Sequence, residues 1–284
     1  MKAIILTYHS HHVLGAGYDV NDHVAFPADL ELITALGYRI VELGELVQEA
    51  TRRGFWRSIA TRGTKLIALT FDDGPVFDAC DFTHPVLGNQ RSFLGAMTDF
   101  RESTMGKQQP TLAATSFVIA SVEARLAMES SFDERYTYLQ PGSMRDDWWS
   151  DAIDSGLIAI GNHSWDHLHP ALPVVAHSRQ AKANFTQVDN SADADLQIEQ
   201  AARYIMTKTA GRGSPWFAYP FGHYNEFLVH EYLPELARRT GLQGAVTTDA
   251  RPVRRNDSIW CLPRYTCGHH WKSSHELSRL LLGH

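Results

Sequence analysis

Short apolar runs recur along the chain, and segments with the apolar spacing of amphipathic helices separate them. Runs of this length, bounded by Gly, Pro or Asp, predict buried strands. The predicted strands are residues 3–8, 38–41, 66–71, 115–120, 157–160, 216–219, 244–248 and 260–262. The predicted helices are residues 27–36, 43–50, 146–155 and 225–240, and residues 175–210 are predicted to be largely helical.

The alternation of strands with helices predicts an α/β fold whose parallel sheet is closed or nearly closed into a barrel. No repeat, low-complexity tract or Pro/Ser-rich linker divides the sequence, so residues 1–284 are predicted to form one domain. Residues 76–109 show no clear period and are interpreted as an inserted excursion. Because chemistry in such barrels lies at the C-terminal ends of the strands, polar clusters at those ends are the candidates for a site.

Composition limits the kinds of binding partner that we expect and indicates the cellular compartment. A net charge of −6 and a pI near 6.2 give no basic footprint, so no nucleic-acid partner is expected. No apolar run approaches the roughly 18 residues of a membrane span. The three cysteines lack the number and spacing of a disulfide framework, which fits a reducing compartment. The first residues do not have the pattern of a signal peptide. We therefore expect a cytoplasmic protein, although a chain trimmed of its leader would look the same. The sequence does not predict an oligomeric state.

Two carboxylates follow the predicted strand at residues 66–71. Asp72 and Asp73 lie between that strand and Gly74-Pro75, in the segment Thr-Phe-Asp-Asp-Gly-Pro. Adjacent side chains of an extended chain point in opposite directions, so one carboxylate can bind a metal while the other approaches the same centre from another side. An Asp-rich turn explains the same residues without any chemistry, because Asp-Gly and Gly-Pro are common in turns.

Two histidines follow the predicted strand at residues 157–160. His163 and His167 are four residues apart, and one helical turn would place both imidazoles on the same face. Imidazole nitrogens with a carboxylate oxygen are a common ligand set for zinc and neighbouring metals. Loop histidines with ordinary hydrogen bonds are the alternative. His169 is predicted to point elsewhere and not to bind the metal.

Together these motifs resemble the polysaccharide deacetylase family, whose domain is also called the NodB homology domain. Thr-Phe-Asp-Asp-Gly-Pro at 70–75 and His-Ser-x-x-His at 163–167 match its first two motifs in the expected order. Phe-Ala-Tyr-Pro-Phe-Gly at 217–222 and Leu-Thr-Tyr-His at 6–9 resemble the branch that acts on poly-N-acetylglucosamine and similar polymers. The resemblance is spread over most of the chain and implies a distorted (β/α) barrel.

The resemblance also implies roles for individual residues. Asp73, His163 and His167 correspond to the ligands of a divalent metal, for which Zn²⁺ is expected and Co²⁺, Ni²⁺ or Mn²⁺ are open. Asp72 corresponds to the general base that takes a proton from the attacking water. The backbone N–H of Phe221 would donate to the developing oxyanion.

This chain departs from the common family pattern in two places. Ala218 stands where many members have an Arg that steadies the catalytic Asp, and we predict that Arg264 reaches Asp72 from a neighbouring strand end. The motif that supplies a catalytic His near the C-terminus of other members is permuted to the N-terminus here. His9 is therefore the predicted general acid that protonates the leaving amine. Its competitors, if the order is not permuted, are His269, His270 and His275.

The resemblance predicts an enzyme that removes N-acetyl groups from an N-acetylated amino sugar in a poly- or oligosaccharide. Two alternatives remain: a hydrolase of another small amide or cyclic imide on the same barrel, and a catalytically silent barrel that binds glycan. The excursion at 76–109 follows the metal-binding Asp and is predicted either to border the site as a lid or wall, or only to pack. Its aromatic residues could stack on a sugar or anchor the excursion; they are Phe77, Phe82, His84, Phe93 and Phe100.

Overall fold

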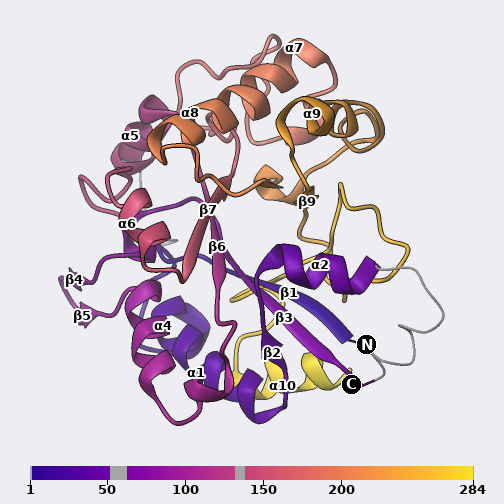
Figure 1. Cartoon of the computed structure of the whole chain (residues 1–284). Coiled ribbons are helices and arrows are strands. Elements are labelled where there is room, and N and C mark those ends of the chain that lie inside the picture. The colour runs from indigo at the N-terminus through magenta and orange to yellow at the C-terminus, as the bar shows by residue number, and fades with distance from the viewer. Residues whose placement is uncertain (1, 52–62, 132–137, 284) are drawn as a thin grey trace.

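The computed structural model describes residues 2–51, 63–131 and 138–283, and its centre is a parallel sheet (Figure 1). The strands of this sheet are β1 (Lys2–Tyr8), β2 (Arg39–Ile40), β3 (Lys65–Phe71), β6 (Ala114–Val118), β7 (Ile158–Asn162), β8 (Trp216–Ala218), β9 (Gly244–Val246) and β10 (Tyr265–Thr266). Their order is β10-β1-β3-β6-β7-β8-β9, and β2 pairs with β3 beside this path. All of these pairings are parallel.

The two longest strands, β1 and β3, pair in the interior of the sheet because their side chains are apolar on both faces. β1 and β3 pair in register from Lys2 and Lys65 to Tyr8 and Phe71. Six of the seven residues in each strand are buried. Strands that are covered on both faces read as continuous hydrophobic runs, which is why the sequence predicted these two so well. The shared register brings Tyr8 and Phe71 to the same edge, so the segments that follow β1 and β3 start side by side.

The sheet curves into a distorted barrel that is incompletely closed, as the predicted fold class required. In the described residues no ladder joins β9 to β10, and Val246 of β9 instead makes an isolated bridge to Leu262 in the segment before β10. The predicted strand at 260–262 is therefore wrong, because its last residue makes a single bridge and no ladder forms. The chain from Leu262 to Tyr265 instead crosses the gap in the barrel and places Arg264 inside it, fully buried.

Helices cover the outside of the sheet (Figure 1). They are α1 (Asp22–Ala35), α2 (Leu43–Thr51), α4 (Phe93–Glu102), α5 (Val122–Ser131), α6 (Trp149–Asp154), α7 (Ser191–Ala194), α8 (Gln200–Lys208), α9 (Leu233–Thr240) and α10 (Ser274–Leu282). π-helical segments at Asp195–Glu199 and Leu228–Tyr232 lead into α8 and α9. In the view of Figure 1, α1, α4 and α10 lie at the bottom of the molecule, and α7, α8 and α9 lie at the top.

Two predicted helix boundaries are wrong. α1 begins at Asp22 rather than Pro27, because the side chain of Asn21 accepts a hydrogen bond from the backbone N–H of His23 and caps the helix earlier. Pro27 lies inside the helix, where the burial of Phe26 and Leu30 compensates for the hydrogen bond that proline cannot donate. In the region 175–210, residues 175–184 are not helical and the continuous helix begins only at Ser191.

The excursion at 76–109 has its own secondary structure. It contains the 3₁₀ turn η2 (Val76–Asp78), a hairpin of β4 (Phe82–His84) and β5 (Gly88–Gln90), α4, and the 3₁₀ turn η3 (Gly106–Gln108). α4 packs against α1. The aromatic side chains that the sequence singled out are mostly core residues: Phe77, Phe82, Phe93 and Phe100 are buried and His84 is half-buried. These four phenylalanines anchor the excursion and are not available to stack on a ligand.

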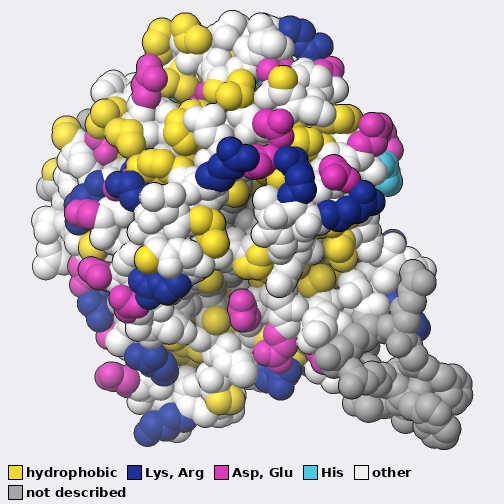
Figure 2. All heavy atoms as spheres, turned by 45° about the horizontal axis from the view of Figure 1, so that its top comes forward, with side chains coloured by type: hydrophobic (Ala, Val, Ile, Leu, Met, Phe, Trp, Pro, Cys, Tyr) yellow, Lys and Arg dark blue, Asp and Glu magenta, His cyan; other side chains and the backbone are white. Residues whose placement is uncertain are grey.

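Surface and chemical features agree with the composition. On the face that Figure 2 shows, acidic and basic side chains are interspersed, with hydrophobic side chains scattered between them. Cys80, Cys261 and Cys267 are all free thiols. Within the described ranges, no helix combines the length and the apolar character that crossing a bilayer requires.

Candidate active site

A cavity of about 500 Å³ lies at the C-terminal ends of β1, β3 and β7. It brings together the motifs that the sequence placed at separate strand ends. Its titratable lining residues are His9, His11, Asp72, Asp73, His163, His167, His169 and His269. None of the described residues at 76–109 lines this cavity.

The turn after β3 fixes the two carboxylates. The backbone N–H of Asp72 donates to Tyr8 O at 3.1 Å and so continues the ladder between β1 and β3. Asp73 then takes a left-handed conformation with φ of 72°. Gly74 follows with φ of 70°, and a Cβ there would lie 2.5 Å from Cγ1 of Val118. Glycine is therefore required at this position both by its conformation and by the close approach of β6.

Asp73, His163 and His167 form the group that could bind a metal. Each offers one ligand atom, and these three atoms lie within 4.8 Å of one another. Oδ1 of Asp73 is 3.5 Å from Nε2 of His163 and 3.6 Å from Nε2 of His167. All three residues are buried. Two imidazole nitrogens and a carboxylate oxygen at this spacing match the protein ligands of an open, catalytic zinc site.

A hydrogen bond orients one of the two imidazoles, and burial keeps the other neutral. Nδ1 of His163 donates to the carbonyl oxygen of Ala218 at 2.9 Å, since a carbonyl can only accept, and this hydrogen bond turns Nε2 toward Asp73. Burial, helped by neighbouring His163, lowers the pKa of His167 to about 3, so this imidazole is neutral. The pKa of Asp73 is held below its usual range: burial alone would raise it, but electrostatic interaction with the imidazoles of His167, His11 and His163 favours the carboxylate form and outweighs burial.

The predicted helical turn between His163 and His167 is wrong, because a tight loop brings the two rings together instead. Ser164 and His167 have positive φ angles of 73° and 59°. Oγ of Ser164 accepts from the backbone N–H of His167, and the buried carboxylate of Asp166 accepts from the backbone of Leu168 and from the side chain of Gln197. The ring centroids of His163 and His167 are 4.8 Å apart. The side chains of Ser164 and Asp166 thus stabilise this loop conformation, which the spacing of the two histidines alone does not predict.

Asp72 is bound by Arg264. The guanidinium donates from Nη1 to Oδ1 and from Nη2 to Oδ2 of Asp72, both at 2.8 Å. It also donates to the hydroxyl of Thr70 and to the carbonyl of Thr247. Burial alone would raise the pKa of Asp72, but the charge of Arg264 outweighs it and lowers that pKa below its ordinary value. The contact that the sequence predicted for Arg264 is thus present, with two parallel hydrogen bonds.

The four candidates for a general acid differ in whether they line the cavity. His9 and His269 both line the cavity. His9 directly follows β1, and its backbone N–H donates to Oδ2 of Asp22 at 2.8 Å. His270 does not line the cavity, and its Nδ1 accepts from the backbone N–H of Thr266. His275 lies in α10, also outside the cavity.

The other predicted site residues also lie at the cavity. Phe221 has φ of 59° in the 3₁₀ turn η6 (Pro220–Gly222), and its half-exposed ring packs against His167 with 4.4 Å between ring centroids. His169 lines the same cavity, so the prediction that it points elsewhere is wrong, although it does not belong to the group of three possible ligands.

His11 is a site residue that the sequence reasoning missed. Its Nε2 lies 3.6 Å from Oδ2 of Asp73, and burial lowers its pKa to about 4 despite the nearby carboxylate. The sequence does contain a histidine cluster here, His9-Ser10-His11-His12, but a turn closed by the backbone N–H of His12 on the carbonyl of His9 gives these rings their directions. His9 and His11 both face the cavity, with 5.5 Å between their ring centroids.

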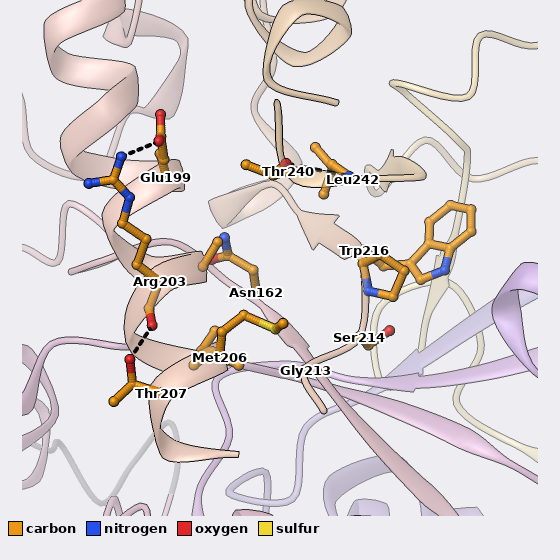
Figure 3. Close-up of a pocket in the computed structure, with 13 residues that line it drawn as sticks. Asn162, Glu199, Arg203, Met206, Thr207, Gly213, Ser214, Trp216, Thr240 and Leu242 are labelled. Atoms are coloured by element: carbon orange, nitrogen blue, oxygen red, sulfur yellow. Dashed lines mark hydrogen bonds and ion pairs between the residues drawn. The ribbon is translucent and has the colours of Figure 1, made fainter. Parts of the chain in front are cut away.

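A second cavity, of about 370 Å³, has a different character (Figure 3). Its walls include Ile205, Met206, Trp216 and Leu242. The one carboxylate in its lining, Glu199, is paired with Arg203 and with Arg239. No histidine or cysteine lines it among the described residues, so it offers no group for acid–base or metal chemistry.

Comparisons with known proteins give one family match and several similar folds. Residues 107–243 match the model of the polysaccharide deacetylase family, in a range that includes His163 and His167. The fold is similar to IcaB from Ammonifex degensii, at 19% identity and a TM-score of 0.59, covering 99% of this chain and 97% of that one. It is also similar to the Streptococcus pyogenes deacetylase PplD in complex with acetate, at 17% identity and a TM-score of 0.58, covering 99% and 98%.

A third solved structure of this fold is a de-N-acetylase from Aggregatibacter actinomycetemcomitans, at 12% identity and a TM-score of 0.56, covering 98% of this chain and 100% of that one. The comparison with curated proteins gives no match. Over residues 107–243 the chain is therefore similar to the polysaccharide deacetylase family.

Proposed function

We propose that this chain is a metal-dependent N-deacetylase that hydrolyses the acetamide of an N-acetylated amino sugar in an oligo- or polysaccharide. The observation that carries the proposal is the convergence of Asp73, His163 and His167 beside the Arg264–Asp72 pair, at one end of the barrel. Deacetylases of the same fold, including one that is in complex with acetate, support the choice of an acetyl group.

The residues present fit a divalent cation. Asp73 Oδ1 and the Nε2 atoms of His163 and His167 would hold it, and the hydrogen bond from His163 to Ala218 already orients one of the ligands. When bound, the cation supplies Lewis-acid polarisation of the amide carbonyl and lowers the pKa of a water molecule. Zn²⁺ is our first choice because the donor set is two imidazoles and one carboxylate, while Co²⁺, Ni²⁺ and Mn²⁺ suit similar donors.

Asp72 is the proposed general base. The paired guanidinium of Arg264 keeps its carboxylate ionised and fixes the plane of its two oxygens. A carboxylate of low pKa can accept a proton only from an acidified donor, so its task depends on a cation at the neighbouring group. Asp72 would receive the proton of the attacking water while the new C–O bond forms.

His9 is the proposed general acid, and Phe221 contributes its backbone. Protonation of the amine by His9 lets the C–N bond break without expelling an amide anion. The N–H of Phe221, at the turn that borders the cavity, would donate to the oxyanion of the tetrahedral intermediate.

The test is acetate release from N-acetylglucosamine oligomers by the purified chain, with bound metal quantified and Asp73→Asn as the matched variant. We expect release that depends on metal and that disappears in Asp73→Asn. Bound metal without acetate release would redirect the proposal to another amide or imide substrate. A chain that neither binds metal nor turns over would contradict it and favour a silent glycan-binding barrel.

A further inference from the structure

We propose that His11 is a positioning residue that holds the outer oxygen of Asp73 and thereby aims the inner oxygen of Asp73 at the metal. This inference rests on the proposed function, because it concerns the metal ligand of that site. It adds a residue that lies outside the matched motifs and outside the group of three ligands.

The two oxygens of Asp73 face different imidazoles. Oδ1 faces His163 and His167, at 3.5 Å and 3.6 Å, whereas Oδ2 faces Nε2 of His11 at 3.6 Å. His11 is not itself within the group of described residues whose ligand atoms converge within 4.8 Å. A fourth ligand would have to converge on that same point, so His11 acts on the carboxylate and not on the cation.

The loop that carries His11 is anchored on both sides of it. Oγ of Ser10 donates to Oδ1 of Asp78 at 2.5 Å, and Oγ of Ser116 donates to Oδ2 of the same carboxyl at 2.6 Å. Ser10, Asp78 and Ser116 are completely buried. On the other side, Nδ1 of His12 lies 2.7 Å from Oδ1 of Asp22. His11 is therefore held between two buried carboxyl groups by its neighbours in sequence.

The backbone of the loop is fixed as well. The carbonyl of Ser10 lies 2.7 Å from Nε2 of His23, a ring in contact with Phe93 of α4. The carbonyl of His11 accepts from the backbone N–H of Tyr138 at 2.7 Å. Loops usually tolerate movement of their side chains, but one with this many anchors presents its imidazole at a set place.

A carboxylate ligand needs such a partner because it can rotate about its Cβ–Cγ bond. Rotation would exchange the two oxygens or let both approach the cation, and either change alters the direction of the lone pair that binds. An N–H at Nε2 of His11 would attract Oδ2 and oppose that rotation, and both side chains are mostly buried. Partners of this kind change metal affinity by about 10- to 100-fold.

The experiment is a competitive titration of the metal-free full-length chain with zinc chloride against a chromophoric chelator. Four proteins are compared: wild type, His11→Leu, His11→Gln and His9→Gln. Leu fills the same space without an N–H, Gln keeps an N–H donor near the position of Nε2, and His9→Gln changes the neighbouring imidazole that faces the same cavity. Circular dichroism of the metal-free proteins checks that each is folded.

We expect His11→Leu to weaken zinc binding by about 10- to 100-fold, and His11→Gln and His9→Gln to stay within about threefold of wild type. Rescue by Gln separates positioning from simple packing. Wild-type affinity in His11→Leu, or an equal loss in His11→Gln, would overturn the inference while leaving the proposed function in place. A wild-type chain that binds no zinc would overturn the inference and the proposed function together.

Discussion

Asp72 and Asp73 are neighbours in the chain, yet the two sides of the site that surround them are built in opposite ways. Asp72 meets a permanent positive charge, because the guanidinium of Arg264 donates to both of its oxygens at 2.8 Å. Asp73 meets three imidazoles at 3.5–3.6 Å, two of which have pKa values lowered by burial. The guanidinium beside Asp72 would repel a metal cation, whereas the imidazoles of His163 and His167 can bind one together with Asp73. Two identical side chains can thus serve as a base and as a metal ligand.

The largest expected effect comes from removing either carboxylate. Asp72→Asn and Asp73→Asn should each lower kcat/KM for acetate release by at least about 100-fold, since one removes the base and the other a ligand. The measurement is acetate release at saturating zinc. If Asp72→Asn keeps wild-type kcat/KM, then Asp72 is not the base, and the proposed difference in role between Asp72 and Asp73 is wrong.

Replacing the general acid should have the next largest effect. His9→Gln should lower kcat by about 100-fold or more, because the leaving amine loses its proton donor. His269→Gln is the matched control, since His269 lines the same cavity. We expect it to retain kcat within about tenfold. The measurement is kcat as a function of pH for both variants. A larger loss of kcat in His269→Gln than in His9→Gln would make His269 the acid.

Removing the fixed charge affects both turnover and stability. Arg264→Met leaves the buried carboxyl of Asp72 without its partner, a change that costs about 3–5 kcal/mol of the free energy of unfolding. The pKa of Asp72, now raised by burial without compensation, should move the acidic limb of the kcat/KM profile to higher pH. Denaturant unfolding and the pH profile measure the two effects, and zinc affinity should stay near that of wild type.

The double variant Arg264→Met/Asp72→Asn sharpens this result. It should recover part of the lost stability, because no unpaired charge remains, but none of the turnover. A single variant that keeps both the stability and the pH profile of wild type would show that something other than Arg264 holds Asp72 ionised.

The smallest effect concerns the loop that carries His9 and His11. Burial raises the pKa of Asp78 to about 7, although the hydroxyls of Ser10 and Ser116 oppose the shift. The folded state therefore holds this proton more tightly than the unfolded state. Its contribution to the free energy of unfolding is full below about pH 4 and is lost as the pH rises to about 7.

Asp78→Asn, which cannot ionise, should remove that decline and raise the stability above pH 7 by up to about 4 kcal/mol. The check is urea unfolding at pH 5 and pH 8, with the exposed Asp147→Asn as the control for a lost carboxylate. An unchanged difference between the two pH values would mean that the carboxyl of Asp78 does not titrate in this range.

The sequence predicted the parts of the molecule that depend on local pattern. Continuous apolar runs found β1 and β3, and motifs at strand ends found the residues that meet in the cavity. It could not find features that distant side chains decide. The turn at His163–His167 depends on the acceptors Ser164 and Asp166, and residues 260–262 do not form a strand because the barrel stays open there.

Other predictions remain predictions. The cytoplasmic location, the boundaries of the excursion and the roles of Asp72, His9, Arg264 and Phe221 in turnover belong to this group. His11 shows the limit of motif reasoning most clearly: it lies two residues beyond a matched segment, and only the fold brings it to Asp73.

The central claim is that adjacent carboxylates have separate tasks, and the most direct test is the zinc affinity of Asp72→Asn beside that of Asp73→Asn. The account predicts that Asp72→Asn binds zinc within about threefold of wild type, while Asp73→Asn loses at least about 100-fold. Equal zinc affinities in the two variants would contradict the division of tasks between the two sides of the site.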